Sequence, residues 1–164
     1  MKNILIFSLV LLSTNVIAQD KDSLAPYRQF PAIPQFKIQL MDSTTWFTKA
    51  GLSSKKPTWI IYFSPDCGHC QIETEEIISN IKSLQNIQIL LVTSRPFEDV
   101  KAFYDHYLLK RFPNIVVGID PARMFVNFYQ VQTTPFSALY NKKGKLIKAY
   151  LSGTSIPELI SLAK

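Results

Sequence analysis

The sequence predicts an α/β fold, a single domain of three layers with helices on the two faces of one sheet. Three observations support this prediction. Segments with the pattern of buried strands alternate along the chain with segments whose apolar residues recur at helical spacing. Near the C-terminus, two strand-like segments are joined by a turn signal, so a hairpin closes the sheet. The chain of 164 residues has the length of one domain with a real core.

The first predicted elements precede the two cysteines of the chain. Residues 20–34 contain three prolines, which favour an extended, non-helical lead-in. Residues 36–40 alternate apolar and polar side chains, as a half-buried strand does. Residues 58–63 are continuously apolar and β-branched or aromatic, which predicts a central strand buried on both faces.

Helices and strands alternate after the cysteines. A helix is predicted from residue 70 onwards, with its apolar residues largely on one side, and residues 87–92 form a second buried strand. Residues 97–109 carry apolar side chains at helical spacing, and residues 115–117 are a short strand candidate. The apolar residues of the first helix are Ile72, Ile77, Ile78, Ile81 and Leu84.

The last third of the chain predicts a helix, a hairpin and a terminal helix. Asp120 is the expected N-cap of the helix and Pro121 its first residue. Segments 136–140 and 145–151 flank the hairpin signal Asn-Lys-Lys-Gly. Residues 155–158 form a capping-box pattern before the terminal helix. The aromatic residues expected in the core, without a function, include Trp46, Trp59, Phe125 and Phe128.

The first 18 residues have the pattern of a secretory signal peptide. A basic start is followed by an apolar stretch over residues 4–12, and Ala18 provides a small residue for cleavage. An uncleaved membrane anchor and a buried N-terminal strand are the alternatives, but the apolar stretch is short for an anchor. We therefore expect export to the periplasm or the extracytoplasmic side of the cell envelope. The predicted organisation is a signal peptide over 1–18, a lead-in over 19–32 and a folded domain over 33–164.

Composition and charge exclude several classes of protein. Hydrophobic residues make up 47% of the chain, which excludes a disordered or low-complexity sequence. Two cysteines are too few for a disulfide-stapled miniprotein or a Cys-only zinc site. The net charge is +6, but the basic residues are scattered and one small group suits a solvated hairpin tip, so nucleic-acid binding is not expected. That group comprises Lys142, Lys143, Lys145 and Lys148.

The functional argument rests on Cys67-Gly68-His69-Cys70, which follows the central strand and opens a helix. Unpaired N–H groups and the partial positive charge of a helix N-terminus stabilise a thiolate at Cys67. Gly68 is expected to allow a tight turn, and the spacing brings the two sulfurs close enough to bridge. A protonated His69 would lower the pKa of Cys67 further and make the disulfide easier to reduce. We therefore predict Cys67 as the exposed nucleophile and the more buried Cys70 as the resolving thiol.

Other interpretations of the cysteine pair fit the sequence less well. A structural disulfide across so short a loop would restrain little chain entropy. A c-type haem needs a histidine directly after Cys70, where Gln71 stands. A metal site would have to use His69 or His106, the only histidines. The prediction is thus redox chemistry with neither cofactor nor metal.

Four features of the chain resemble a known family: Phe63, Cys67 to Cys70, Thr134-Pro135 and Gly153. They resemble the thioredoxin superfamily and, within it, the TlpA-like exported thiol–disulfide oxidoreductases, over roughly residues 33–164. The resemblance implies a thioredoxin-like α/β/α sandwich with a mixed central sheet. It implies one extra helix, for which 97–109 is the candidate, before Pro135 in the cis state. It also implies that the backbone of Thr134 binds an extended substrate segment beside Cys67.

Glu73 matches an acidic residue that the TlpA-like branch carries beside its active site. Its spacing places it near the same helix face as Cys70, where it would accept a proton when Cys70 becomes the attacking thiolate. A solvated side chain, like those of Glu75 and Glu76, is the alternative. The implied partners are protein thiols and disulfides and a membrane-bound redox partner, whereas the oligomeric state stays open.

The chain departs from plain thioredoxins just before the cysteines. Ile61 stands where they carry a buried acidic residue, and Asp66 stands where they carry tryptophan. An anionic Asp66 would raise the pKa of Cys67 and oppose His69, or it would serve only as a helix N-cap. The Gly-His pair matches protein disulfide isomerases, whose poise is relatively oxidising. The family branch and the dipeptide thus disagree on the direction of electron flow.

Three rival functions remain as alternatives on this fold. A peroxiredoxin-type peroxidase would use Ser64, three residues before Cys67, but Ile60 stands where its motif requires proline. A copper-binding assembly factor would use thiolates and an imidazole, which suit Cu(I), although its usual cysteine spacing is one residue longer. A binding module with an inert cysteine pair is the third alternative.

Overall fold

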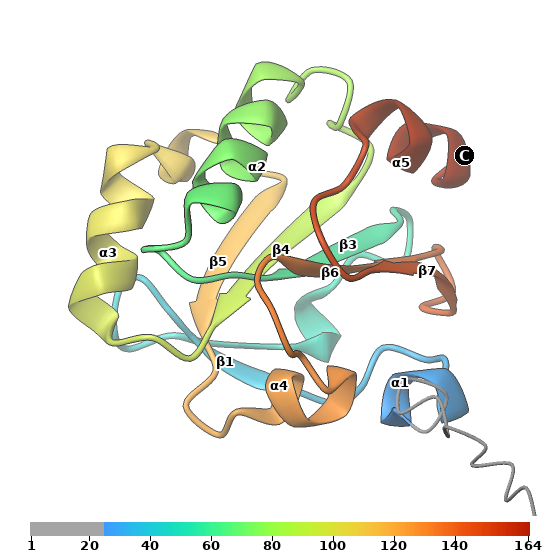
Figure 1. The fold of residues 1–164 in the computed structure, drawn as a ribbon, viewed down its shortest axis with the longest axis horizontal. Coiled ribbons are helices and arrows are strands. Elements are labelled where there is room, and N and C mark those ends of the chain that lie inside the picture. The colour runs from blue at the N-terminus through green and yellow to red at the C-terminus, as the bar shows by residue number, and fades with distance from the viewer. Residues whose placement is uncertain (1–24) are drawn as a thin grey trace, which may run out of the picture.

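A seven-stranded mixed sheet runs through the middle of the computed structural model, which describes residues 25–164 (Figure 1). The strand order is β2-β1-β5-β4-β3-β6-β7. The pairs β3–β4 and β4–β5 are parallel, and the other pairs are antiparallel. The predicted signal peptide over 1–18 lies outside the described residues. The strands are β1 (Lys37–Leu40), β2 (Trp46–Thr48), β3 (Thr58–Tyr62), β4 (Gln88–Thr93), β5 (Ile115–Ile119), β6 (Phe136–Tyr140) and β7 (Leu146–Tyr150).

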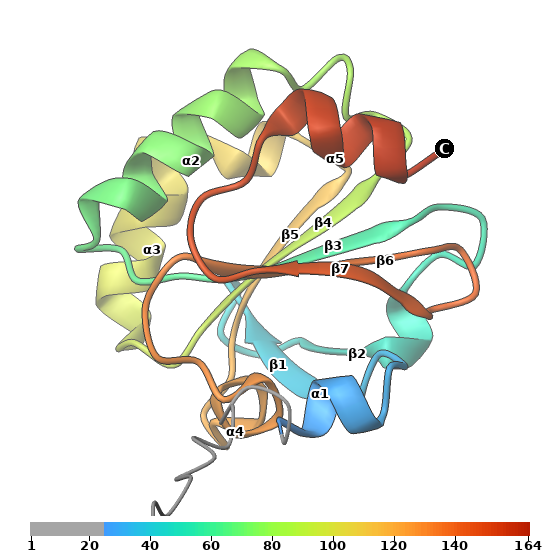
Figure 2. The same ribbon diagram turned by 45° about the vertical axis from the view of Figure 1, so that its right-hand side comes forward.

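Helices cover both faces of this sheet, as Figure 2 shows. Three helices, α2, α3 and α5, pack on one face, and α1 and α4 pack on the other. The predicted three-layer α/β fold is confirmed, and α3 occupies the position of the candidate extra helix. In the described part of the chain no helix is long and apolar enough to cross a membrane. The helices are α1 (Pro26–Gln29), α2 (Gly68–Ser79), α3 (Phe97–His106), α4 (Met124–Tyr129) and α5 (Ile156–Leu162), with 3₁₀ turns η2 (Lys49–Gly51) and η3 (Leu109–Arg111).

The central strand β3 supplies side chains to both cores because successive residues of a strand point to opposite faces. Trp59 and Ile61 belong to the core beneath α2, α3 and α5. Ile60 belongs to the core shared with α1 and α4. All three are at most 1% exposed, as predicted for a strand buried on both faces.

The lead-in is not extended throughout, which corrects the prediction from its prolines. Pro26–Gln29 form one helical turn, because proline is well tolerated in the first turn of a helix. Tyr27 is 1% exposed, and its ring lies 5.7 Å from that of Tyr129 and 5.8 Å from that of Phe136. Ala25 and Tyr27 therefore attach the lead-in to the domain, whereas residues 28–32 are exposed.

The predicted start of the fourth helix is wrong by three residues. Pro121 lies in a turn, and α4 begins at Met124 with Arg123 as its N-cap. Asp120 is buried, and its carboxylate accepts a hydrogen bond from the Phe125 N–H over 2.8 Å. Asp120 thus satisfies a free N–H group of this helix from a position farther upstream than an N-cap.

Local patterns misjudge the exposure of two side chains and the capping hydrogen bond of a third. Trp46, expected in the core, is 43% exposed because β2 is an edge strand, and the Lys37 ammonium lies 4.4 Å from its ring centroid. Ile72, expected on the buried side of its helix, is 56% exposed. Ser155 is the N-cap of α5, but its side chain makes no capping hydrogen bond.

Candidate active site

The two cysteines lie where β3 has ended and α2 begins. Cys67 is the N-cap of α2, and Cys70 lies in the first turn of that helix. Cys67 is partly exposed, whereas Cys70 is 2% exposed and packs in the core beneath α2. Both thiols are free. Cys70 is thus the more buried of the two thiols, as expected from the sequence.

Thr134 and Pro135 lie against Cys67, although they follow it by more than sixty residues. They lead into β6, and the peptide bond between them is cis. The Cys67 Sγ donates a hydrogen bond to the Thr134 carbonyl oxygen over 3.3 Å. Because β6 pairs with β3, the sheet carries Thr134 to the edge from which the cysteine loop leaves. The structure thus brings together Cys67, Thr134 and Pro135.

The two thiols have opposite tendencies to ionise. Burial raises the pKa of Cys67, but hydrogen bonds from the Thr134 and Cys70 side chains and from the N–H groups of Cys70 and His69 outweigh it. The pKa of Cys67 is therefore lowered from its ordinary value. Burial dominates at Cys70 and raises its pKa to about 12. Cys67 is consequently the thiol that ionises first.

The two residues between the cysteines are exposed at the surface. The His69 imidazole has no hydrogen-bond or ion-pair partner among the described residues. Gly68 is the first residue of α2, and a Cβ there would meet no atom within 4 Å. Neither close packing nor a positive φ therefore requires glycine at this position. The missing side chain leaves the surface beside Cys67 open.

Glu73 is buried beneath α2, so the alternative of a solvated side chain is wrong. It is 4% exposed, whereas its neighbours Glu75 and Glu76 are exposed. The Thr154 N–H donates to Glu73 Oε1 over 3.0 Å, and Oε2 has no partner among the described residues. Burial raises the pKa of Glu73, and the hydrogen bonds from Thr154 offset part of that rise. A buried carboxyl group with one free oxygen thus lies one turn beyond Cys70.

Asp66 forms an ion pair beside the thiol loop instead of capping α2. Its carboxylate accepts a hydrogen bond from the Ser64 hydroxyl and lies 3.0 Å from the Arg95 guanidinium. The hydrogen bond from Ser64 is the main cause of the lowered pKa of Asp66. Arg95 was missed in the sequence because it lies 29 residues from Asp66 and no local pattern connects them. The paired charge weakens the opposition to Cys67 that an isolated Asp66 would provide.

A hollow of about 550 Å³ lies between α2 and α3, next to the thiol loop. Its lining mixes apolar rings with two carboxylates. Because Pro65 and Asp66 belong to both the loop and the hollow, the hollow adjoins the cysteines. The lining side chains include Pro65, Asp66, Asp99, Phe103, His106 and Tyr107.

The histidines do not converge on the cysteines as a metal site. His106 lies on α3 and lines the hollow, whereas His69 lies between the cysteines. Within residues 25–164, no three His, Cys, Asp or Glu side chains form a group that could hold a metal ion.

Solved structures provide the comparison with known proteins, since no family model and no curated protein matches the sequence. A solution structure from Neisseria meningitidis, provisionally named a thioredoxin, has 26% identity and a TM-score of 0.65, and the match covers 80% of this chain and 85% of that one. A secreted Mycobacterium tuberculosis disulfide oxidoreductase, described as homologous to E. coli DsbE, has 19% identity and a TM-score of 0.63, with 79% and 94% covered. A thiol:disulfide interchange protein of the thioredoxin family from Chlorobium tepidum has 15% identity and a TM-score of 0.67, with 80% and 94% covered.

These similarities confirm the thioredoxin-like fold that the resemblance to the family implied. One of these structures is named a thioredoxin, one a disulfide oxidoreductase and one a thiol:disulfide interchange protein, and the matches span most of each chain. Both findings favour a redox enzyme.

Proposed function

We propose that this protein is an exported thiol–disulfide oxidoreductase that exchanges electrons with protein disulfides through Cys67 and Cys70. The observation that carries the proposal is the pairing of a partly exposed thiol of lowered pKa with a buried thiol whose pKa is about 12. A reactive thiolate and a protected resolving thiol are what two-step exchange requires. The names of the similar structures support this activity.

In the first step, the Cys67 thiolate attacks one sulfur of a substrate disulfide. A mixed disulfide forms between Cys67 and the substrate, and the other substrate sulfur leaves as a thiolate. Thr134 and Pro135 shape the groove for the substrate. The Thr134 carbonyl oxygen, which accepts the hydrogen bond from the free Cys67 thiol, becomes available to an extended substrate segment when that thiol reacts.

In the second step, Cys70 attacks the Cys67 sulfur, and the second substrate thiol is released. The chain ends with a Cys67–Cys70 disulfide, and the substrate has gained two electrons and two protons. Because the pKa of Cys70 is about 12, its thiol needs a base before it can attack. We assign that role to Glu73, whose Oε2 is buried and free of partners among the described residues.

The side chains near Cys67 support the rival functions less well. The Ser64 hydroxyl donates to Asp66, so the polar residue that a peroxidase would use beside Cys67 is already engaged. A copper site would require a third ligand beside the two thiols, and His69 is the nearest candidate in the sequence. Export, a membrane-bound redox partner and tuning of the potential by Gly68 and His69 are parts of the proposal.

The reduction potential of the Cys67–Cys70 pair tests the proposal directly. We expect a reversible two-electron transition when alkylation mass shifts are followed across glutathione or dithiothreitol buffers. A value near about −270 mV indicates a reductant, and one near about −180 mV an oxidant or isomerase. The Cys70→Ser variant is expected to accumulate mixed disulfides with its substrates. A pair without any reversible transition would refute the redox function and turn attention to copper.

A further inference from the structure

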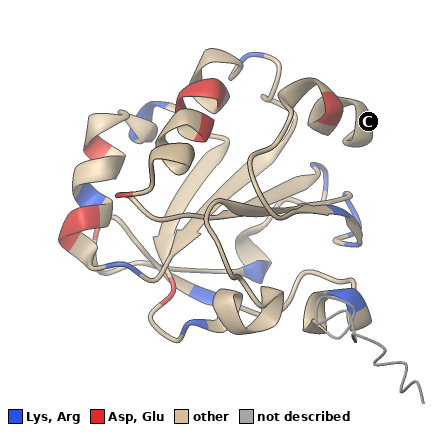
Figure 3. Cartoon of the chain, in the orientation of Figure 1, with Lys and Arg blue, Asp and Glu red and all other residues tan. Residues whose placement is uncertain are grey.

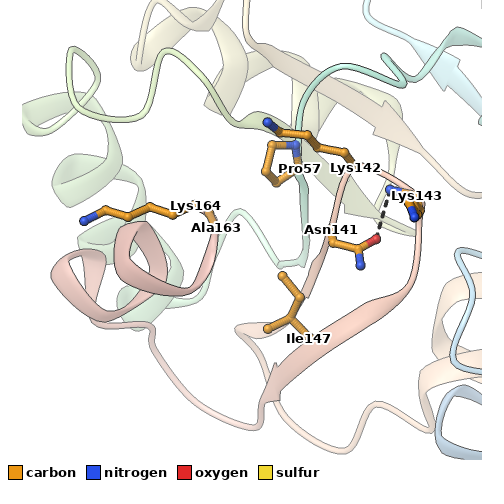
Figure 4. A pocket seen from close by; sticks show the side chains of 7 residues that line it. All are labelled: Pro57, Asn141, Lys142, Lys143, Ile147, Ala163 and Lys164. Atoms are coloured by element: carbon orange, nitrogen blue, oxygen red, sulfur yellow. Dashed lines mark hydrogen bonds between the residues drawn. The ribbon is translucent and has the colours of Figure 1, made fainter.

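Lysines from three distant segments meet at one end of the molecule. Lys55 and Lys56 precede β3, Lys142 and Lys143 lie in the turn between β6 and β7, and Lys164 follows α5. We call these five residues the lysine face. Two adjoining surface hollows of about 300 and 460 Å³ are lined by members of this group, together with Pro57 and Ala163. Figure 4 shows Lys142, Lys143 and Lys164 around the first of these hollows.

The charges of the lysine face are not neutralised within the described chain. None of its five side chains forms an ion pair, since the ion pairs within residues 25–164 involve only Arg95, Lys101 and Lys148. Four of the five lysines are exposed, and Lys56 is half-buried and donates to the Gln85 carbonyl oxygen over 2.8 Å. Neither hollow is lined by an acidic residue.

The turn that carries Lys142 and Lys143 is held in one conformation. Asn141 Oδ1 accepts hydrogen bonds from the N–H groups of Lys143 and Lys145. Gly144 has a φ of 73°, in the left-handed region that glycine adopts without strain. The two ammonium groups are therefore presented from a fixed support, beside the exposed apolar side chain of Ile147.

The lysine face and the thiols lie beyond opposite ends of β3. Pro57 directly precedes the strand and the cysteine loop follows it, and a strand of five residues spans about 17 Å. Figure 3 shows the basic residues of the β6–β7 turn on one side of the molecule, and acidic residues on α2 and α3 toward the other. A partner bound to the lysine face would leave Cys67 accessible.

We propose that the lysine face docks this protein onto a bilayer surface rich in anionic phospholipids. Anionic headgroups attract lysines close to the surface, and several lysines act together. Lysine without arginine favours diffuse attraction over bidentate recognition of one phosphate. The hollows contain no aromatic side chain on which a nucleic-acid base would stack. The proposal is independent of the redox function, because it uses none of the residues of the thiol site.

Sedimentation with vesicles tests this proposal on the protein as isolated from expressing cells. We expect stronger binding to vesicles of equal parts phosphatidylcholine and phosphatidylglycerol than to pure phosphatidylcholine, and we expect added salt to weaken the difference. The Lys142→Glu/Lys143→Glu variant is expected to bind the anionic vesicles at least about 30-fold less tightly, since each lysine lost near such a surface removes a factor of about five and each new glutamate adds repulsion. The Lys55→Glu/Lys164→Glu variant should lose binding to a similar degree.

The matched control reverses two basic residues elsewhere. Lys37 pairs with Thr48 at the far edge of the sheet, and Arg123 is exposed before α4. The Lys37→Glu/Arg123→Glu variant has the same net charge as the test variants and should keep most of the binding. Equal losses in all three variants would show a net-charge effect and overturn the proposal. So would equal binding to neutral and anionic vesicles, or binding to an acidic protein without binding to anionic vesicles.

Discussion

The two ends of β3 carry functional groups of opposite kinds. At one end, Cys67 and Glu73 are held by hydrogen bonds to distant segments, burial raises the pKa values of Cys70 and Glu73, and hydrogen bonds lower that of Cys67. At the other end, four of the five lysines of the lysine face are exposed, and none of the five has an ion-pair partner in the described chain. Fixed geometry suits a reaction in which one bond is exchanged. Exposed, additive charge suits attraction to a broad surface.

The largest expected effect is the loss of the reacting thiol. In the Cys67→Ser variant, turnover with a protein disulfide should fall by about a thousandfold or more, because a hydroxyl cannot form the mixed disulfide. The assay is reduction of a disulfide substrate with dithiothreitol as electron source. The Lys142→Glu/Lys143→Glu variant, changed at the opposite end, serves as the control. Wild-type turnover in Cys67→Ser would contradict the assignment of the nucleophile.

The second effect is the difference in reactivity between the two reduced thiols. The pKa of Cys67 is lowered from its ordinary value and that of Cys70 is raised to about 12, so at neutral pH the thiolate fraction of Cys67 far exceeds that of Cys70. Alkylation at Cys67 should rise with pH as its lowered pKa is passed, while Cys70 stays unmodified. Peptide mapping after brief treatment with iodoacetamide measures both rates. Equal modification of the two residues would show that burial does not protect Cys70.

A smaller effect is expected from the buried carboxyl group. Glu73→Gln keeps an oxygen for the Thr154 N–H but removes the base, so release of substrate from the mixed disulfide should slow by about a hundredfold. The first step should be unchanged. Glu76→Gln, on the exposed side of the same helix, is the matched control. Stopped-flow separation of the two steps would show a purely structural role if both slowed together.

The same substitution gives a pH signature of stability. Folding raises the pKa of Glu73, because burial favours the neutral carboxyl group. The stability that this group contributes is therefore full below the unfolded pKa, and it is lost as the pH rises through the folded pKa. Glu73→Gln should therefore be as stable as wild type at neutral pH or more stable, with a flatter dependence above pH ~4.5. Urea unfolding at several pH values measures this difference.

The smallest expected effect is that of the lysine face on the reactivity of Cys67 at the opposite end of β3. Reversing Lys142 and Lys143 should change the alkylation rate of Cys67 by less than about twofold, because charges farther apart than about 10 Å are screened at 0.1 M salt. The rate is measured at moderate and at low ionic strength. A large change at moderate salt would mean that the lysine face tunes the thiols.

Sequence alone predicted the thiol end far better than the lysine end. The order strand, Cys-x-x-Cys, helix is local, so it placed Cys67 at a helix start and Cys70 one turn inside. The cis bond before Pro135 was predicted only from the resemblance to a family. Glu73 stayed ambiguous because its burial depends on Thr154, 81 residues later.

The features that sequence missed are those made by distant segments. Arg95 meets Asp66 only because β4 lies beside β3. The hairpin lysines were visible as a group, but Lys55, Lys56 and Lys164 join them only in the folded sheet. The start of α4 was predicted wrongly for a different reason. Asp120 accepts a hydrogen bond from the helix from farther upstream than an N-cap, a geometry that the N-cap pattern does not include.

The burial of Tyr27 determines when the N-terminal part of the domain can become ordered. Its ring partners, Tyr129 and Phe136, stand more than a hundred residues later in the chain. Closing so long a loop carries a large entropic cost, and the contacts that offset it exist only after α4 and β6 have assembled. We therefore expect α1 to dock late in folding and to detach early in unfolding. During synthesis, α1 is therefore made before most of the domain but packs only after α4 and β6 have folded.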